Sequence, residues 1–131
     1  MTKMTRFFAM TIMAAVILSG VDTFAGGTRT LLQGALTAVP GAPAGAKGKA
    51  KFDASASRTN FSVEAQGLAA LNGRSAAIFV NGANIGSTGI ALGRLKLELS
   101  TQRGQIVPAV SAGTVVEVHV AGQRILAGSV R

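Results

Sequence analysis

The chain contains a single histidine, His119, and this residue limits the chemistry that the sequence can support. In the run "VEVHV" it alternates with valines and shares one face of an expected strand with Val115 and Glu117. A histidine beside a carboxylate is the usual composition of a general base or of part of a metal site. A zinc site needs at least three protein ligands, and nothing in the sequence brings Asp53, Glu64 or Glu98 to His119. The pattern therefore predicts a surface histidine and no metal site.

Other catalytic patterns are also missing from the sequence. No Gly-x-Ser-x-Gly motif presents a nucleophilic serine, and a glycosidase would need two carboxylates facing each other across a sugar. The chain has no Trp or Tyr on which a sugar would stack. The glycine-rich run "NGANIGSTG" lacks the lysine of a phosphate-binding loop. We therefore expect a protein that is not an enzyme and that uses no cofactor.

The run "KGKAKFDASASRTNFSVEAQGL" places three lysines at alternate positions, so that a strand would present them on one face. A hairpin with a tight turn at Ala56 and Ser57 sets the opposite positions as Lys51 with Ser62, Lys49 with Glu64 and Lys47 with Gln66. The Lys49–Glu64 pair is then the expected ion pair, and the other two lysines stay unpaired. Two interpretations remain open: a solvated face whose lysines guard the sheet against edge pairing, or a docking strip for a polyanion.

A second basic run, "RLKLELS", alternates charged residues with leucines. The candidate polyanion-binding residues are therefore Lys47, Lys49, Lys51, Arg94 and Lys96. Sequence-specific nucleic-acid binding is not expected, because the outward positions lack aromatic rings for base stacking.

Short alternating runs separated by Gly, Asn, Ser and Pro indicate an all-β domain, and no segment has helical periodicity. The expected strands cover residues 30–39, 49–54, 59–66, 76–80, 85–90, 94–100, 114–120 and 125–130, with a tight hairpin turn at Asn81-Gly82. About eight short strands predict a small antiparallel β-sandwich, immunoglobulin-like or related. The expected core residues are Leu32, Leu36, Phe52, Phe61, Val63, Ile78, Val80, Leu95, Leu97, Leu99, Val116, Val118 and Ile125.

The first and last expected strands share a pattern. "LLQGAL" (31–36) and "ILAGSV" (125–130) both read apolar, apolar, any residue, Gly, any residue, apolar. Either the two strands are related and lie side by side, or the likeness is a coincidence in a chain rich in Gly, Ala and Leu.

The first 25 residues have the layout of a secretory signal peptide: a basic start at Lys3 and Arg6, an apolar run from Phe7 to Leu18, and small residues at Thr23 and Ala25. An uncleaved N-terminal membrane anchor is the alternative. Cleavage would leave a single domain, residues 26–131, that keeps 11 of the 13 Lys and Arg and 4 of the 5 Asp and Glu, a net charge of +7. The absence of cysteine excludes disulfides, thiolate metal sites and a cysteine-linked lipid anchor.

The segment "GKAKF…FSVEAQGL", from Gly48 to Leu68, resembles the opening half of chordin-type (CHRD) β domains of bacterial secreted proteins. Those domains resemble Gly-x-Ala-x-Phe followed by an alternating strand that ends in Gly-Leu. The His-bearing segment that follows in that family has no counterpart in "LNGRSAAIFVNG". The resemblance implies an exported all-β domain and carries over no functional residue.

Together these observations predict an exported, non-catalytic structural or interaction module of the cell envelope or extracellular space. Its partners would be further copies of itself or an envelope protein, and β-strand addition at a sheet edge is the expected mode of association. The alternative is a binding protein for an anionic polymer, such as a polysaccharide or lipid head groups, that uses the basic strand face. Contact with a membrane is expected only through an uncleaved N-terminal segment.

Overall fold

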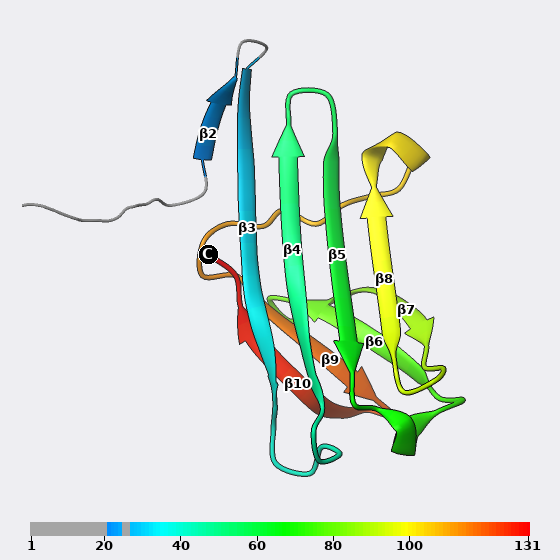
Figure 1. Ribbon diagram of the computed structural model, residues 1–131. Coiled ribbons are helices and arrows are strands. Elements are labelled where there is room, and N and C mark those ends of the chain that lie inside the picture. Colours follow the sequence, from blue (N-terminus) through cyan, green and yellow to red (C-terminus); the bar gives the residue numbers. More distant parts are fainter. Residues whose placement is uncertain (1–20, 25–26) are drawn as a thin grey trace, which may run out of the picture.

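The computed structural model describes residues 21–24 and 27–131 (Figure 1). Most of the expected signal peptide lies outside this range. Val21–Phe24, which that prediction includes, form strand β2 and pair with the start of strand β3 (Gly27–Ala38). No helix among the described residues has the length and apolar character to cross a membrane.

All eight expected strands are present. They are β3 (Gly27–Ala38), β4 (Lys47–Ser55), β5 (Thr59–Gln66), β6 (Ser75–Val80), β7 (Ala83–Gly89), β8 (Leu95–Ser100), β9 (Val115–Val120) and β10 (Gln123–Ser129). Two short 3-10 helices, η2 (Ala69–Leu71) and η3 (Thr101–Arg103), lie in the connections. The all-β class is therefore confirmed for the described residues, and β5 has the predicted bounds.

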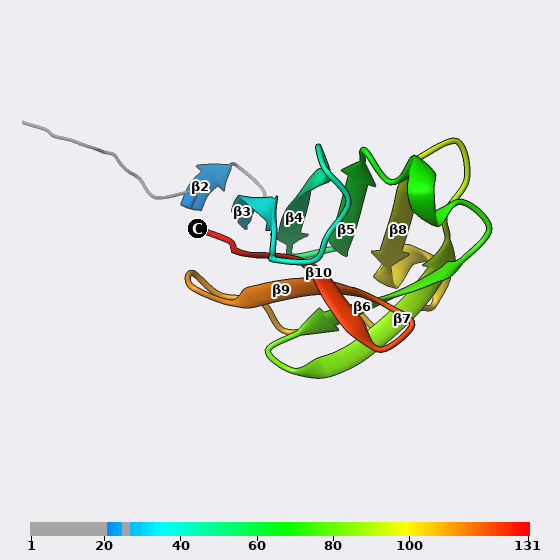
Figure 2. The ribbon, with the colours of Figure 1, turned by 90° about the horizontal axis from the view of Figure 1, so that it is seen from below.

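The eight strands form one antiparallel sheet in the order β7-β6-β9-β10-β3-β4-β5-β8. This sheet folds over on itself, so that β3, β4, β5 and β8 lie above β10, β9, β6 and β7 (Figure 2). Its two end strands, β7 and β8, approach each other without a hydrogen-bonded ladder between them in the described residues. The result is a single, nearly closed sheet with a seam between β7 and β8.

Apolar side chains from both halves of the sheet fill the space between them. Phe61, Val63, Ile78, Val116 and Val118 are fully buried, as their alternation with polar residues predicts. Among the expected core residues only Leu97 is partly exposed, and it packs against the core from β8. The core also includes residues that the prediction left out, namely Ala46, Ala50, Ala65, Leu68, Ala76, Ile90, Val120, Leu126 and Val130.

Leu126 is buried because β10 is irregular. The pairing of β10 with β9 shifts between Arg124 and Leu126, so that Ile125 and Leu126 both point inward. A β-bulge adds one residue to one strand and breaks the strict alternation of faces. Simple alternation therefore assigns only Ile125 to the core.

Strands β3 and β10 lie side by side, as the shared Gly-containing pattern suggests. Leu126 pairs with Ala38 and Ala127 with Thr37, and the backbone amides of Gln33 and Arg131 each donate to the other residue's carbonyl oxygen, both at 3.1 Å. The glycine of each pattern lies at this contact. A Cβ atom at Gly34 would collide with the backbone of Ser129, and one at Gly128 would collide with the backbone of Ala35.

Tight turns connect β6 to β7 and β9 to β10. Asn81 and Gly82 have φ angles of 47° and 85°, and they form the hairpin turn that the Asn-Gly pair predicts. Ala121 and Gly122 have nearly the same conformation, with φ angles of 53° and 79°. Alanine is much less suited than asparagine to a positive φ, so the second turn carries strain that the first avoids.

Candidate functional site

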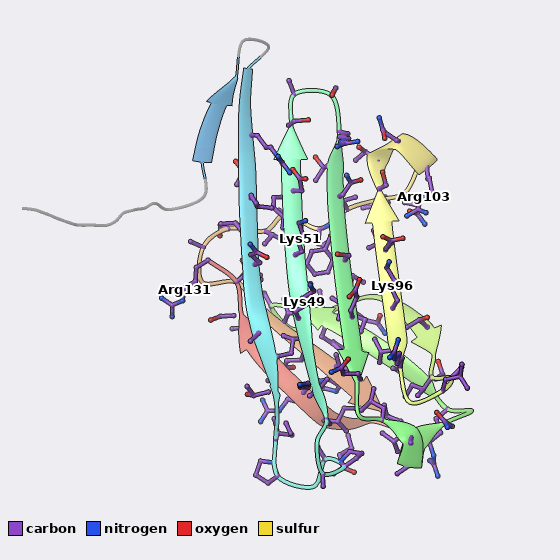
Figure 3. The ribbon with its side chains drawn as sticks, in the orientation of Figure 1. Lys49, Lys51, Lys96, Arg103 and Arg131 are labelled. Atoms are coloured by element: carbon purple, nitrogen blue, oxygen red, sulfur yellow. The ribbon has the colours of Figure 1, made fainter. Side chains whose placement is uncertain are left out.

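The outer face of β4, β5 and β8 carries most of the predicted site residues (Figure 3). The register of β4 and β5 is the predicted one: Lys51 lies opposite Ser62, Lys49 opposite Glu64 and Lys47 opposite Gln66. All three lysines are exposed. They form a straight row along β4, which we call the lysine row.

The predicted ion pair between Lys49 and Glu64 is wrong. Glu64 instead lies 3.5 Å from Nζ of Lys96, which is opposite it on β8, and Lys96 is also 3.5 Å from Glu98. The prediction paired β5 with β4 alone, whereas β5 has a strand on each side. Lys96 is therefore held between two carboxylates.

The members of the lysine row make no ion pair within 4.0 Å among the described residues. Across β3, their neighbours are the uncharged residues Thr37, Ala35 and Gln33. Glu64, opposite Lys49, is already paired with Lys96. Asp53, two residues beyond Lys51 on β4, is already paired with Arg29. The row is thus a line of positive charge that is open to solvent.

Four of the five predicted site residues line one surface hollow of about 670 Å³. These are Lys47, Lys49, Arg94 and Lys96, and Glu64 is the only acidic residue in the lining. The hollow has a net formal charge of +3 from these five side chains. It crosses β4, β5 and β8, so residues far apart in the sequence contribute to a single basic surface.

The fifth predicted residue, Lys51, lines a neighbouring hollow of about 430 Å³ on the same face. This hollow has mixed charge, since Asp53 and Glu98 lie in its lining with Lys51 and Arg103. Asp53 forms an ion pair with Arg29, whose Nε and Nη2 atoms donate to the two carboxylate oxygens at 2.8 and 2.7 Å. These hydrogen bonds from Arg29 lower the pKa of the Asp53 carboxyl.

His119 lies in the other layer, on the outer face of β9. Its Nε2 atom is 3.0 Å from Oε1 of Glu117, and Nη1 of Arg124 donates to Oε2 of Glu117, also at 3.0 Å. The Phe79 ring packs against the imidazole with a centroid distance of 4.3 Å. The hydrogen bonds from His119 and Arg124 lower the pKa of Glu117. In the described part of the chain, no three His, Cys, Asp or Glu side chains come together as a metal site would require.

Sequence reasoning missed the Glu64–Lys96–Glu98 cluster and the Arg29–Asp53 pair. The alternation in "RLKLELS" places Lys96 and Glu98 on one face, but no signal in the sequence tells which strand lies beside β8. Likewise, Arg29 meets Asp53 because β3 begins at Gly27, three residues before the predicted start.

Comparisons with known proteins add no assignment to this geometry. No protein-family model matches the chain, and no curated protein matches it.

Proposed function

We propose that this protein is an exported, non-catalytic interaction module that binds an anionic polymer through the outer face of β4, β5 and β8. The observation that carries the proposal is the gathering of Lys47, Lys49, Arg94 and Lys96 around one hollow with a single acidic residue. Cations that line an open surface attract an extended anion without a deep pocket.

Two further features support the proposal. The lysine row has neutral neighbours on the β3 side, so no acid of β3 lies opposite Lys47, Lys49 or Lys51. The net charge of +8 for the whole chain, or +7 after cleavage, attracts anionic partners over longer distances.

We also propose that the nearly closed sheet is classed with the immunoglobulin-like or related β-sandwiches, on the ground that its two halves face each other (Figure 2). Export is proposed on the sequence of residues 1–25. Cleavage after Ala25 would remove β2 and leave the first residues of β3 without that neighbour.

Retention on a column of sulfated polysaccharide tests the binding function. The variant with Lys47, Lys49 and Lys51 changed to Gln should elute at clearly lower salt than the unaltered protein, because it loses the lysine row. A matched control changes three other exposed cations, Arg58, Arg74 and Arg131, to Gln, which removes the same net charge. If both variants eluted at equally lowered salt, retention would depend only on net charge, which would contradict a binding face.

Self-association is the competing function. It is tested by the solution mass of residues 26–131, measured by light scattering at low and high salt. A monomer at both salts supports the polymer-binding function. An oligomer that persists at high salt would instead point to pairing between copies at the end strands of the sheet, β7 and β8.

A further inference from the structure

The charges on the basic face differ in how free they are to bind a ligand. Lys96 already contacts Glu64 and Glu98, both at 3.5 Å, so a ligand anion would have to compete with two carboxylates for it. Lys47, Lys49 and Lys51 have no carboxylate within that distance in the described part of the chain. The ligand charges should therefore meet the lysine row first.

The lysine row has a fixed repeat along β4. Alternate residues of a strand are separated by six backbone bonds, a distance of roughly 7 Å. Two of the three lysines lie opposite an uncharged residue of β5 that can donate a hydrogen bond: Gln66 is opposite Lys47, and Ser62 is opposite Lys51. A linear polyanion lying along β4 would thus meet one ammonium group for each roughly 7 Å of its own length.

Phosphodiester polymers of simple polyols have a matching repeat. In a chain of glycerol joined by phosphates, six bonds also separate successive phosphorus atoms, and an extended chain of six such bonds spans roughly 7 Å. Carboxylated polysaccharides match less well, because one sugar ring spans less than this repeat and two rings span more. We therefore infer that the ligand of the lysine row is a linear polyol-phosphate polymer, an inference that rests on the proposed polymer-binding function.

The remaining outward side chains suit a ligand that the protein recognises by the charges of its backbone. The outward positions of β4, β5 and β8 carry no aromatic ring, since Phe52 and Phe61 point into the core. Bases of a nucleic acid and faces of a sugar would have no ring to stack on. A polyol phosphate loses nothing by that absence, because it has neither bases nor rings.

The experiment titrates the purified full chain with three polymers of equal charge number: poly(glycerol phosphate), polygalacturonate and oligothymidylate. Affinity is measured at several salt concentrations. With three phosphates neutralised, the slope of log affinity against log salt should be about −2. Poly(glycerol phosphate) should bind at least threefold more tightly than polygalacturonate, and no more weakly than oligothymidylate.

Single variants locate the contact. Lys49→Gln should reduce the magnitude of the salt slope by about 0.7, and should weaken binding about threefold. Glu64→Gln should strengthen binding, because it removes the acid that lies opposite Lys49. Arg131→Gln is the matched control: this arginine lies beyond β3, on the side away from β4 (Figure 3), and its change should leave the slope unaltered.

Each contrary result has its own meaning. Equal or tighter binding of polygalacturonate would overturn the polyol-phosphate ligand while leaving the polymer-binding function in place. Tighter binding of oligothymidylate would overturn it in favour of a nucleic acid. Binding of none of the three polymers would overturn the proposed function itself.

Discussion

Gly34 on β3 and Gly128 on β10 each face the backbone of the other's strand, with no space for a Cβ atom at either position. They are the shared glycines of the patterns at 31–36 and 125–130. Their contact lies where the sheet passes from one half to the other, at the pairing of β10 with β3. A close approach of two backbones requires glycine, so the shared pattern has a physical cause.

Gly128→Ala should therefore destabilise the fold strongly. The added methyl group would lie less than 3.0 Å from the Ala35 backbone, which cannot move without shifting β3. We expect the free energy of unfolding to fall by about 3 kcal/mol in urea denaturation. Gly89→Ala is the control, because a Cβ there meets nothing within 4 Å, and its stability should change by less than about 0.5 kcal/mol. Similar losses in the two variants would argue against a close contact at Gly128.

The turn between β9 and β10 offers a stabilising substitution. Ala121 has a φ of 53° and precedes Gly122, as Asn81 precedes Gly82 in the turn between β6 and β7. Ala121→Asn should raise the free energy of unfolding by about 0.5–1 kcal/mol, because asparagine tolerates this conformation better than alanine. Thermal unfolding measures the change. The same substitution at exposed Ala112, whose φ is not positive, should have no such effect; a gain there of equal size would refute the turn explanation.

The Arg29–Asp53 pair makes stability depend on acid pH. Hydrogen bonds from Arg29 lower the pKa of Asp53 below its ordinary value of 3.8, so folding favours the ionised carboxylate. This contribution is fully present above the ordinary pKa and is lost as pH falls through the lower pKa of the folded protein. Asp53→Asn should cost about 1 kcal/mol at neutral pH, as expected for a bidentate, partly exposed pair.

Urea unfolding of Asp53→Asn and of the unaltered protein, repeated from neutral pH down to about pH 2, checks this sign. The difference between the two proteins should shrink toward the acid end. A difference that stayed constant over the whole range would mean that the Asp53 charge contributes nothing.

The seam between β7 and β8 is closed by side chains. Leu97 from β8 lies beside Gly86 of β7, with its methyl groups at ordinary contact distance from the position of a Cβ atom there. Leu97→Ala should accelerate amide hydrogen exchange in β7 and β8 more than in β4 and β5. Leu99→Ala, on the same strand and face, should weaken the sheet more evenly, and indistinguishable exchange patterns would show that Leu97 does not close the seam.

The sequence predicts the local structure of this domain better than its long-range arrangement. Alternation identified all eight strands, and one assumed turn set the register of Lys49 and Lys51 against β5. Both depend on neighbouring residues. The order of the strands depends on how the whole sheet folds over, and for that reason the position of β8 beside β5 was not predictable.

The same distinction applies to the candidate site. Four of the five predicted residues share a hollow, because alternation fixes which face of its strand a charged residue occupies. Alternation does not say which charges meet across strands, so it does not predict that Glu64 and Glu98 hold Lys96, one of the candidate polyanion-binding residues. The bulge that buries Leu126 is a further irregularity that strict alternation misses.

The central place of β10 has a consequence for the order of folding. Strands β3, β4 and β5 are sequential neighbours that can associate early, and β6 and β7 form a second local hairpin. These two groups are joined into one sheet only by β9 and β10, which come from the last part of the sequence. Because loop closure over such a separation is slow compared with hairpin formation, the joining of the halves should be the late step. A nascent chain from which residues 123–129 are still missing would contain two incomplete halves, each exposing the apolar face that the other half later covers. Such a chain could still bind chaperones and could still be threaded through a pore.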